Sequence, residues 1–108
     1  MPQYELYVPL TYNSGAPDFG RDIEPSKLNQ TKDELIRQFG PLTIIPTTGS
    51  LEGNWVSPEG KLVRDKIRIF RVVVNFDADQ WFANYNIVVK DRFKQREVLI
   101  FVTEGYTV

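Results

Sequence analysis

Apolar and polar side chains alternate near the start of the chain, over residues 4–10. Alternation with a period of two predicts a strand that is buried on one face. Pro9 lacks an amide hydrogen, so we expect the end of this strand to lie at a sheet edge or at a bulge. The apolar face of the predicted strand consists of Tyr4, Leu6, Val8 and Leu10.

Two later segments space their apolar residues as a helix does. The first is expected to end at Gly40 and Pro41, because the glycine permits positive φ and the proline stops the helix. Its start is open between an N-cap at Ser26 and a capping box that begins at Thr31. The second helix is expected to begin at Asp77. Its apolar stripe is Trp81, Phe82, Tyr85, Val88, Val89 and Phe93.

Between the two predicted helices, the sequence indicates a long β-hairpin. Residues 42–56 alternate irregularly and contain proline and glycine, which predicts a strand with at least one bulge. Residues 57–60 read Ser-Pro-Glu-Gly, an order that favours a type I turn. The return strand covers residues 61–75, and a final strand covers residues 97–103.

The predicted order is therefore strand, helix, strand, strand, helix, strand. Two crossover connections in one sheet are typical of the ferredoxin-like fold. This fold is an α+β sandwich in which two helices cover one face of a four-stranded antiparallel sheet. The chain of 108 residues contains no linker or low-complexity segment, so we expect a single domain over residues 1–108.

Composition excludes several kinds of chemistry. The chain has no cysteine and no histidine, which rules out disulfides, thiolate or imidazole metal sites and Ser-His-Asp triads. We therefore expect no metal and no cofactor. The net charge of −1 offers no basic surface for nucleic acid, and no apolar run is long enough for a bilayer. Without a secretory signal pattern, we expect a cytoplasmic protein with neither nucleic acid nor membrane as a partner.

The uncovered face of the predicted sheet is expected to be apolar. The return strand and the last strand carry apolar residues on both faces, whereas a sheet face that meets water is normally polar. We expect this surface to form a homo-oligomer, most simply a dimer. The alternatives are a small-molecule pocket, or a covering by the loop at residues 13–24. The self-association residues would be Phe70, Val72, Leu99 and Phe101.

A second candidate site lies on the predicted hairpin, where Trp55 precedes several charged residues. An aromatic ring beside cations suits an anionic or planar ligand, although Trp55 can equally pack against a cross-strand neighbour. RNA binding is disfavoured, because the third strand offers Phe70 without the glycine–aromatic motif of RNA-binding domains of this topology. The candidate ligand-binding residues are Tyr7, Trp55, Asp65 and Arg68.

The hairpin and the C-terminal segment also carry short motifs. These motifs are Gly53-Asn54-Trp55 followed by Gly60 and Asp65, the helix end Phe39-Gly40, and Phe93-Lys94-Gln95. In them the chain resembles small uncharacterised bacterial proteins that have a Gly-x-Trp hairpin and a Phe-x-Gln step before the last strand. The resemblance covers most of the chain from Ser26 onward. It implies a ferredoxin-like domain and brings no activity and no functional residues.

Our leading hypothesis for function is a small cytosolic domain that self-associates for binding or assembly and has no catalytic activity. The alternative is a small-molecule-binding protein or enzyme of the dimeric α+β barrel type, with a pocket between sheet and helices. Without histidine or cysteine, such an enzyme would rely on tyrosine, carboxylate or basic side chains. For these roles we name Tyr7, Asp65 and Arg68.

Overall fold

The computed structural model describes residues 1–12, 20–45, 52–56 and 62–106. In chain order the elements are β1 (Pro2–Pro9), α1 (Pro25–Phe39), β2 (Thr43–Ile45), β3 (Glu52–Val56), β4 (Leu62–Val73), α2 (Asp79–Arg92) and β5 (Ile100–Glu104). The long strand predicted over residues 42–56 is divided into β2 and β3. The turn predicted at residues 57–60 lies outside the described residues.

β2, β4, β1 and β5 lie side by side in that order and form a four-stranded antiparallel sheet. β3 pairs with the other end of β4, also antiparallel, so the strand pairing expected for the hairpin is present. The chain is therefore an α+β structure with two helices and a four-stranded antiparallel sheet. Pro9 pairs with Ile67 of β4 but lies beyond the residues of β1 that pair with β5. Its missing amide hydrogen thus removes no bond to β5.

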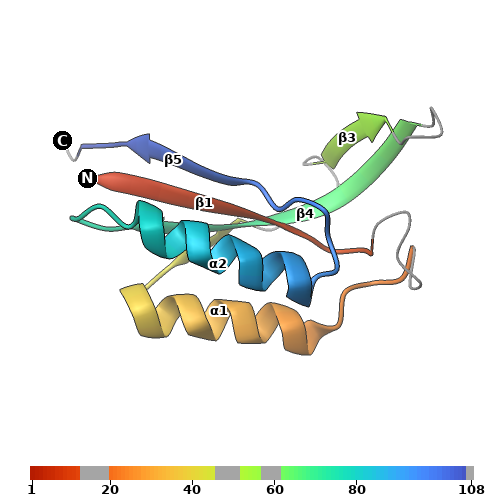
Figure 1. Ribbon diagram of the computed structural model, residues 1–108, viewed down its shortest axis with the longest axis horizontal. Helices are drawn as coiled ribbons and strands as arrows, with labels where there is room; N and C mark the ends of the chain where they lie inside the picture. The colour runs from red at the N-terminus through yellow and green to blue at the C-terminus, as the bar shows by residue number, and fades with distance from the viewer. Residues whose placement is uncertain (13–19, 46–51, 57–61, 107–108) are drawn as a thin grey trace.

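Both helices lie next to each other on the same side of the sheet (Figure 1). α1 begins at Pro25, whose fixed φ suits the first helical turn, and so it starts before Ser26 and Thr31. Thr31 is instead fully buried within the helix, and its hydroxyl donates to the carbonyl of Lys27. The helix ends at Gly40, as predicted, with a φ of 87°. Within the part of the chain that the structure describes, neither helix combines the length and the apolar character needed to cross a membrane.

Alternate residues of β1 and β4 point toward the helices and form the core. The cross-strand register pairs Leu6 with Phe70 and Tyr4 with Val72, so all four side chains share one face. Phe70 is 2% exposed and Val72 is 1% exposed. These two residues are therefore unable to take part in self-association, and that part of our prediction is wrong. Since both faces of β4 carry apolar residues, its alternation did not reveal which face the helices cover.

The opposite face of the sheet is left open by the helices. Leu99 and Phe101, the other two predicted self-association residues, lie on this open face and are 51% and 49% exposed. Val73 of β4 is also half exposed there. The described part of the predicted loop, residues 20–24, leaves these three side chains uncovered. An apolar open face is therefore present, as the sequence predicts.

Candidate functional site

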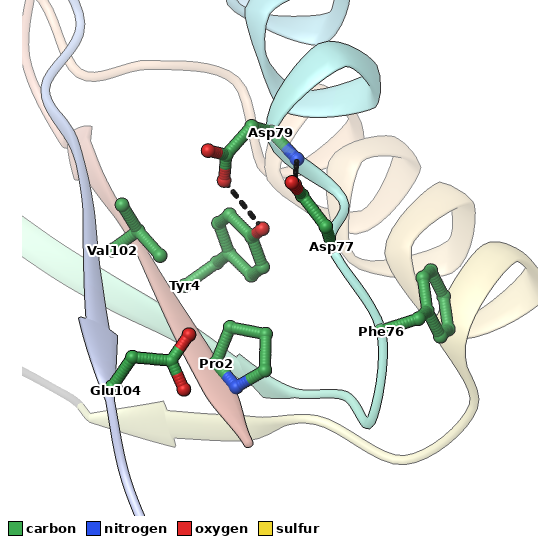
Figure 2. Close-up of a pocket in the computed structure, with 7 residues that line it drawn as sticks. All are labelled: Pro2, Tyr4, Phe76, Asp77, Asp79, Val102 and Glu104. Carbon is green, nitrogen blue, oxygen red and sulfur yellow. Dashed lines mark hydrogen bonds between the residues drawn. The ribbon is translucent and has the colours of Figure 1, made fainter.

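A pocket of about 330 Å³ opens where the helix-covered side of the sheet meets the start of α2. Its volume is at the lower end of the range for small-molecule sites. The pocket is formed by the start of β1, the end of β5 and the turn that leads into α2 (Figure 2). The lining residues are Pro2, Tyr4, Phe76, Asp77, Asp79, Val102 and Glu104.

Tyr4 connects the pocket to the core. Its buried ring stacks on Phe82 with the ring centroids 4.3 Å apart. Its hydroxyl accepts the N–H of Ala78 at 2.8 Å and donates to Oδ1 of Asp79 at 2.6 Å. Burial and the hydrogen bond to the Asp79 carboxylate raise the pKa of Tyr4 to about 12. The hydroxyl therefore stays protonated at neutral pH and acts as a fixed donor that orients Asp79.

Asp77 shapes the turn before α2. Its Oδ1 accepts the N–H of Asp79 at 2.8 Å, so the side chain closes a turn outside the helix. α2 consequently begins at Asp79, later than the predicted start at Asp77. No side chain caps the start of α2, and the amide of Gln80 donates to Oδ1 of Asn84 within the helix. This turn brings the side chains of Asp77 and Asp79 to the rim of the pocket (Figure 2).

Carboxylates dominate the polar lining of the pocket. Glu104 lies 3.4 Å from the amino group of Met1, whereas Asp77 and Asp79 form no ion pair with any described residue. No basic residue is found among the described lining residues, and the exposed ring of Phe76 adds an apolar surface. Such a pocket favours a ligand that carries positive charge and an apolar or aromatic part. Over the described ranges, no three acidic side chains are grouped so that they could hold a metal ion.

The fold does not bring the predicted ligand residues together. Tyr7 lies on the open face of β1, where its ring meets Phe101 edge-on with centroids 5.3 Å apart. The cross-strand register places Arg68 on the opposite, helix-covered face. Neither of them lines the pocket. Trp55 and Asp65 belong to β3 and β4, but their side chains lie outside the described part of the structure.

The pocket is not apparent in the sequence, because each polar residue that lines it also fits a local structural role. Asp77 and Asp79 match the acidic start of a helix, and Tyr4 matches the apolar face of a strand. One signal was present, since a tyrosine on a buried face needs a partner for its hydroxyl group. The identity of that partner, Asp79, depends on tertiary packing that no local pattern contains.

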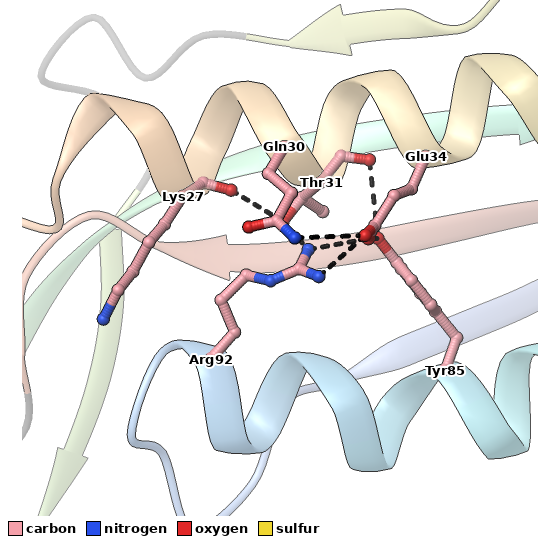
Figure 3. Close-up of polar contacts among 6 residues, drawn as sticks. All are labelled: Lys27, Gln30, Thr31, Glu34, Tyr85 and Arg92. Carbon is pink, nitrogen blue, oxygen red and sulfur yellow. Dashed lines mark hydrogen bonds and ion pairs between the residues drawn. The ribbon is translucent and has the colours of Figure 1, made fainter.

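A second polar cluster joins the two helices (Figure 3). Arg92 of α2 donates to Oγ1 of Thr31 at 2.8 Å and to Oε2 of Glu34 at 2.9 Å. The hydroxyl of Tyr85 donates to Oε1 of Glu34 at 2.7 Å, and burial together with this contact raises the pKa of Tyr85. The hydrogen bonds from Arg92, opposed by partial burial, lower the pKa of Glu34. Because these groups satisfy one another, we interpret the cluster as a structural joint between the helices.

No protein-family model matches the chain, and no curated protein matches its sequence. Among solved structures, the chain is similar to a phage SAM lyase in its apo state, with a TM-score of 0.59, 15% sequence identity, and coverage of 94% of this chain and 78% of that chain. It is also similar to a phage SAM lyase in complex with S-methyl-5′-thioadenosine, with a TM-score of 0.61 and 16% identity over 95% of this chain and 80% of that chain. At this level of identity the likeness shows a shared fold.

The fold neighbours correct our leading hypothesis about function. Both solved structures are of an enzyme, which contradicts the expectation of a self-associating domain without catalytic activity. The finding favours the alternative hypothesis, a small-molecule-binding protein or enzyme. That alternative expects a pocket between sheet and helices, and the acidic pocket lies between the sheet and the start of α2.

Proposed function

We propose that the chain is an enzyme that binds S-adenosylmethionine, or a closely related adenosyl sulfonium compound, in the acidic pocket. The fold neighbours support this, because they are structures of a SAM lyase and one of them holds S-methyl-5′-thioadenosine. The observation that carries the proposal is that the pocket is negatively charged and the ligand is positively charged. Two carboxylates without an ion pair among the described residues, Asp77 and Asp79, line the pocket together with the half-exposed Phe76. The carboxylates suit the positive groups of such a compound, and the aromatic residue suits its planar base.

The carboxylates are best suited to hold the ammonium group of the substrate. S-adenosylmethionine carries one sulfonium and one ammonium group. When the carbon–sulfur bond breaks, the bonding electrons go to sulfur and the sulfonium loses its positive charge. The carbon that leaves sulfur bonds to an oxygen of the substrate's own carboxylate, which closes a lactone. A carboxylate beside the sulfur would therefore stabilise the substrate more than the transition state. We accordingly assign Asp77 and Asp79 to the ammonium group, whose charge the bond cleavage leaves unchanged.

Titration calorimetry with two ligands tests this assignment. S-adenosylhomocysteine has the ammonium group and a neutral thioether, whereas S-methyl-5′-thioadenosine has a neutral thioether and no ammonium group. Asp79→Asn should weaken binding of S-adenosylhomocysteine about tenfold, or about 1.4 kcal/mol, and leave binding of S-methyl-5′-thioadenosine unchanged. Chromatography of the reaction mixture should show S-methyl-5′-thioadenosine appearing as S-adenosylmethionine disappears.

The matched control is Asp91→Asn, which removes an exposed carboxylate from the other end of α2. This variant should bind both ligands as the wild type does. If the wild type neither binds nor consumes S-adenosylmethionine, the proposed function is wrong. If Asp79→Asn weakens both ligands equally, the enzyme proposal stands but the ammonium assignment fails.

For the fold, we propose the ferredoxin-like arrangement that the sequence predicts. β2 and β3 both pair with β4, so they are equivalent to one interrupted strand along its edge. With that assignment, the strand order is the interrupted strand, β4, β1 and β5, the order of a ferredoxin-like sheet. A crystal structure in which residues 46–51 follow the edge of β4 would support this arrangement.

A further inference from the structure

The open face of the sheet has a charged pair at its centre and several apolar side chains around it. The cross-strand register places Glu5 of β1 beside Arg71 of β4, and Oε2 of Glu5 lies 3.0 Å from Nη2 of Arg71. The same register places six apolar side chains on the open face, which are Tyr7, Ile45, Ile69, Val73, Leu99 and Phe101. The polar side chains of Gln3, Thr43 and Thr103 lie on this face as well.

Three of the surrounding side chains are in contact with solvent. Val73, Leu99 and Phe101 are each about half exposed, although all three are apolar. Val73 lies in the row before Glu5 and Arg71, Phe101 lies in their row beside Glu5, and Leu99 lies in the row after them. Exposed apolar side chains gathered on one face are typical of an interaction surface.

We propose that another copy of this chain covers the open face, with Glu5 of one copy against Arg71 of the next. The face carries one negative and one positive group, so it is neutral and complementary to itself. A two-fold axis between the two residues would place each charge opposite its counterpart. Arg71 forms one hydrogen bond among the described residues, to Glu5, and a guanidinium group has five N–H donors. It therefore has donors left for the carboxylate of a second copy.

Two charge reversals, made in separate proteins, test the contact between copies. Glu5→Arg leaves two positive groups at the centre of the face, and Arg71→Glu leaves two negative groups. Each variant alone should be monomeric in native mass spectrometry and light scattering, whereas the wild type should have twice the 12.5 kDa mass of the chain. An equimolar mixture of the two variants should form mixed oligomers, because each then meets the opposite charge.

Two further variants keep the experiment decisive if a charge reversal impairs folding. Phe101→Glu changes a half-exposed residue of the face and preserves the Glu5–Arg71 pair, so it should dissociate the oligomer with an unchanged circular dichroism spectrum. Ile87→Glu, at the 66% exposed Ile87 of α2, is the matched control and should leave the oligomer intact.

Several outcomes would overturn the proposal. A monomeric wild type would do so, and so would an oligomer that survives Phe101→Glu or that dissociates equally with Ile87→Glu. Folded charge-reversal variants that fail to combine would refute the contact between Glu5 and Arg71. A larger closed oligomer that Phe101→Glu dissociates would support the same face with another symmetry. Ligand binding is measured separately, so this proposal and the proposed function can fail independently.

Discussion

Arg92 in α2 and Glu34 in α1 form a two-pronged ion pair, with Nη1–Oε1 and Nη2–Oε2 distances of 2.8 and 2.9 Å. The Arg92 side chain is 10% exposed and the Glu34 side chain is 35% exposed. The pair joins the two helices. Because the guanidinium group is mostly buried, water cannot easily take the place of the carboxylate if the carboxylate is removed.

Removing the negative charge of this pair should destabilise the protein. We expect Glu34→Gln to lower the free energy of unfolding by about 1–2 kcal/mol, less than for a fully buried pair because Glu34 is partly exposed. Urea unfolding measures this difference. Asp33→Asn removes an exposed acid from the same helix and should change stability by less than about 0.5 kcal/mol. Equal losses in the two variants would contradict the role of the pair.

Acid should destabilise the protein through Glu24. The hydroxyl of Tyr12 donates to this carboxylate and Lys27 lies 3.4 Å away, and together they lower its pKa from 4.5 to about 2. The folded chain thus keeps Glu24 ionised at pH values where the unfolded chain protonates it. The stabilisation is present above pH 4.5 and is lost as the pH falls toward about 2.

Urea unfolding at a series of pH values tests this effect. Glu24→Gln should show a smaller loss of stability than the wild type between pH 4.5 and the acid limit. Asp22→Asn, which removes a nearby exposed carboxylate, is the control. A wild-type pH dependence in Glu24→Gln would show that other groups cause the acid sensitivity.

The hydroxyl of Tyr4 should contribute to stability as well as to the pocket. Tyr4→Phe leaves the buried N–H of Ala78 without an acceptor and Asp79 without its donor. We expect a loss of about 1–3 kcal/mol in the free energy of unfolding. Tyr7→Phe is the matched control, because the Tyr7 hydroxyl has no hydrogen bond to any described residue. A loss of the same size in both variants would show that the Tyr4 contacts are not responsible.

Two phenylalanines on opposite faces of the sheet should differ in their importance for folding. Phe70→Ala creates a cavity in the core and should cost about 3–5 kcal/mol. Phe101→Ala removes a half-exposed ring and should cost much less in the monomer. Thermal unfolding at low protein concentration compares them. Equally small losses of stability in the two variants would show that Phe70 is not part of the core.

Local chemistry was sufficient to predict those elements whose limits and faces depend on nearby residues. Tyr4, Leu6 and Val8 are buried on one face of β1, as their alternation predicts. Gly40 ends α1 because its positive φ is accessible to glycine. The start of α1 was harder to predict, because Thr31 has the side chain of a capping residue but serves as a buried partner of Arg92.

Features that depend on tertiary contacts were not predictable from the sequence. Phe70 was assigned to the wrong face because β4 is apolar on both faces, and only its register with β1 settles the matter. The pocket was missed because its carboxylates come from the turn before α2 and from β5, which the fold brings together around Tyr4. Conversely, Tyr7 and Arg68 have suitable chemistry but lie on opposite faces.

The position of β1 in the sheet has a consequence for biosynthesis. Gln3 pairs with Val73 of β4 and with Thr103 of β5, so both neighbours of the earliest strand are made late. Closing such long loops costs chain entropy before the strand contacts compensate for it, and contacts of high sequence separation slow folding. The sheet can therefore be completed only after β5 has left the ribosome. Until α2 has been made, the apolar face of β1 lacks part of its covering, and a nascent chain in this state is open to capture by chaperones or to aggregation.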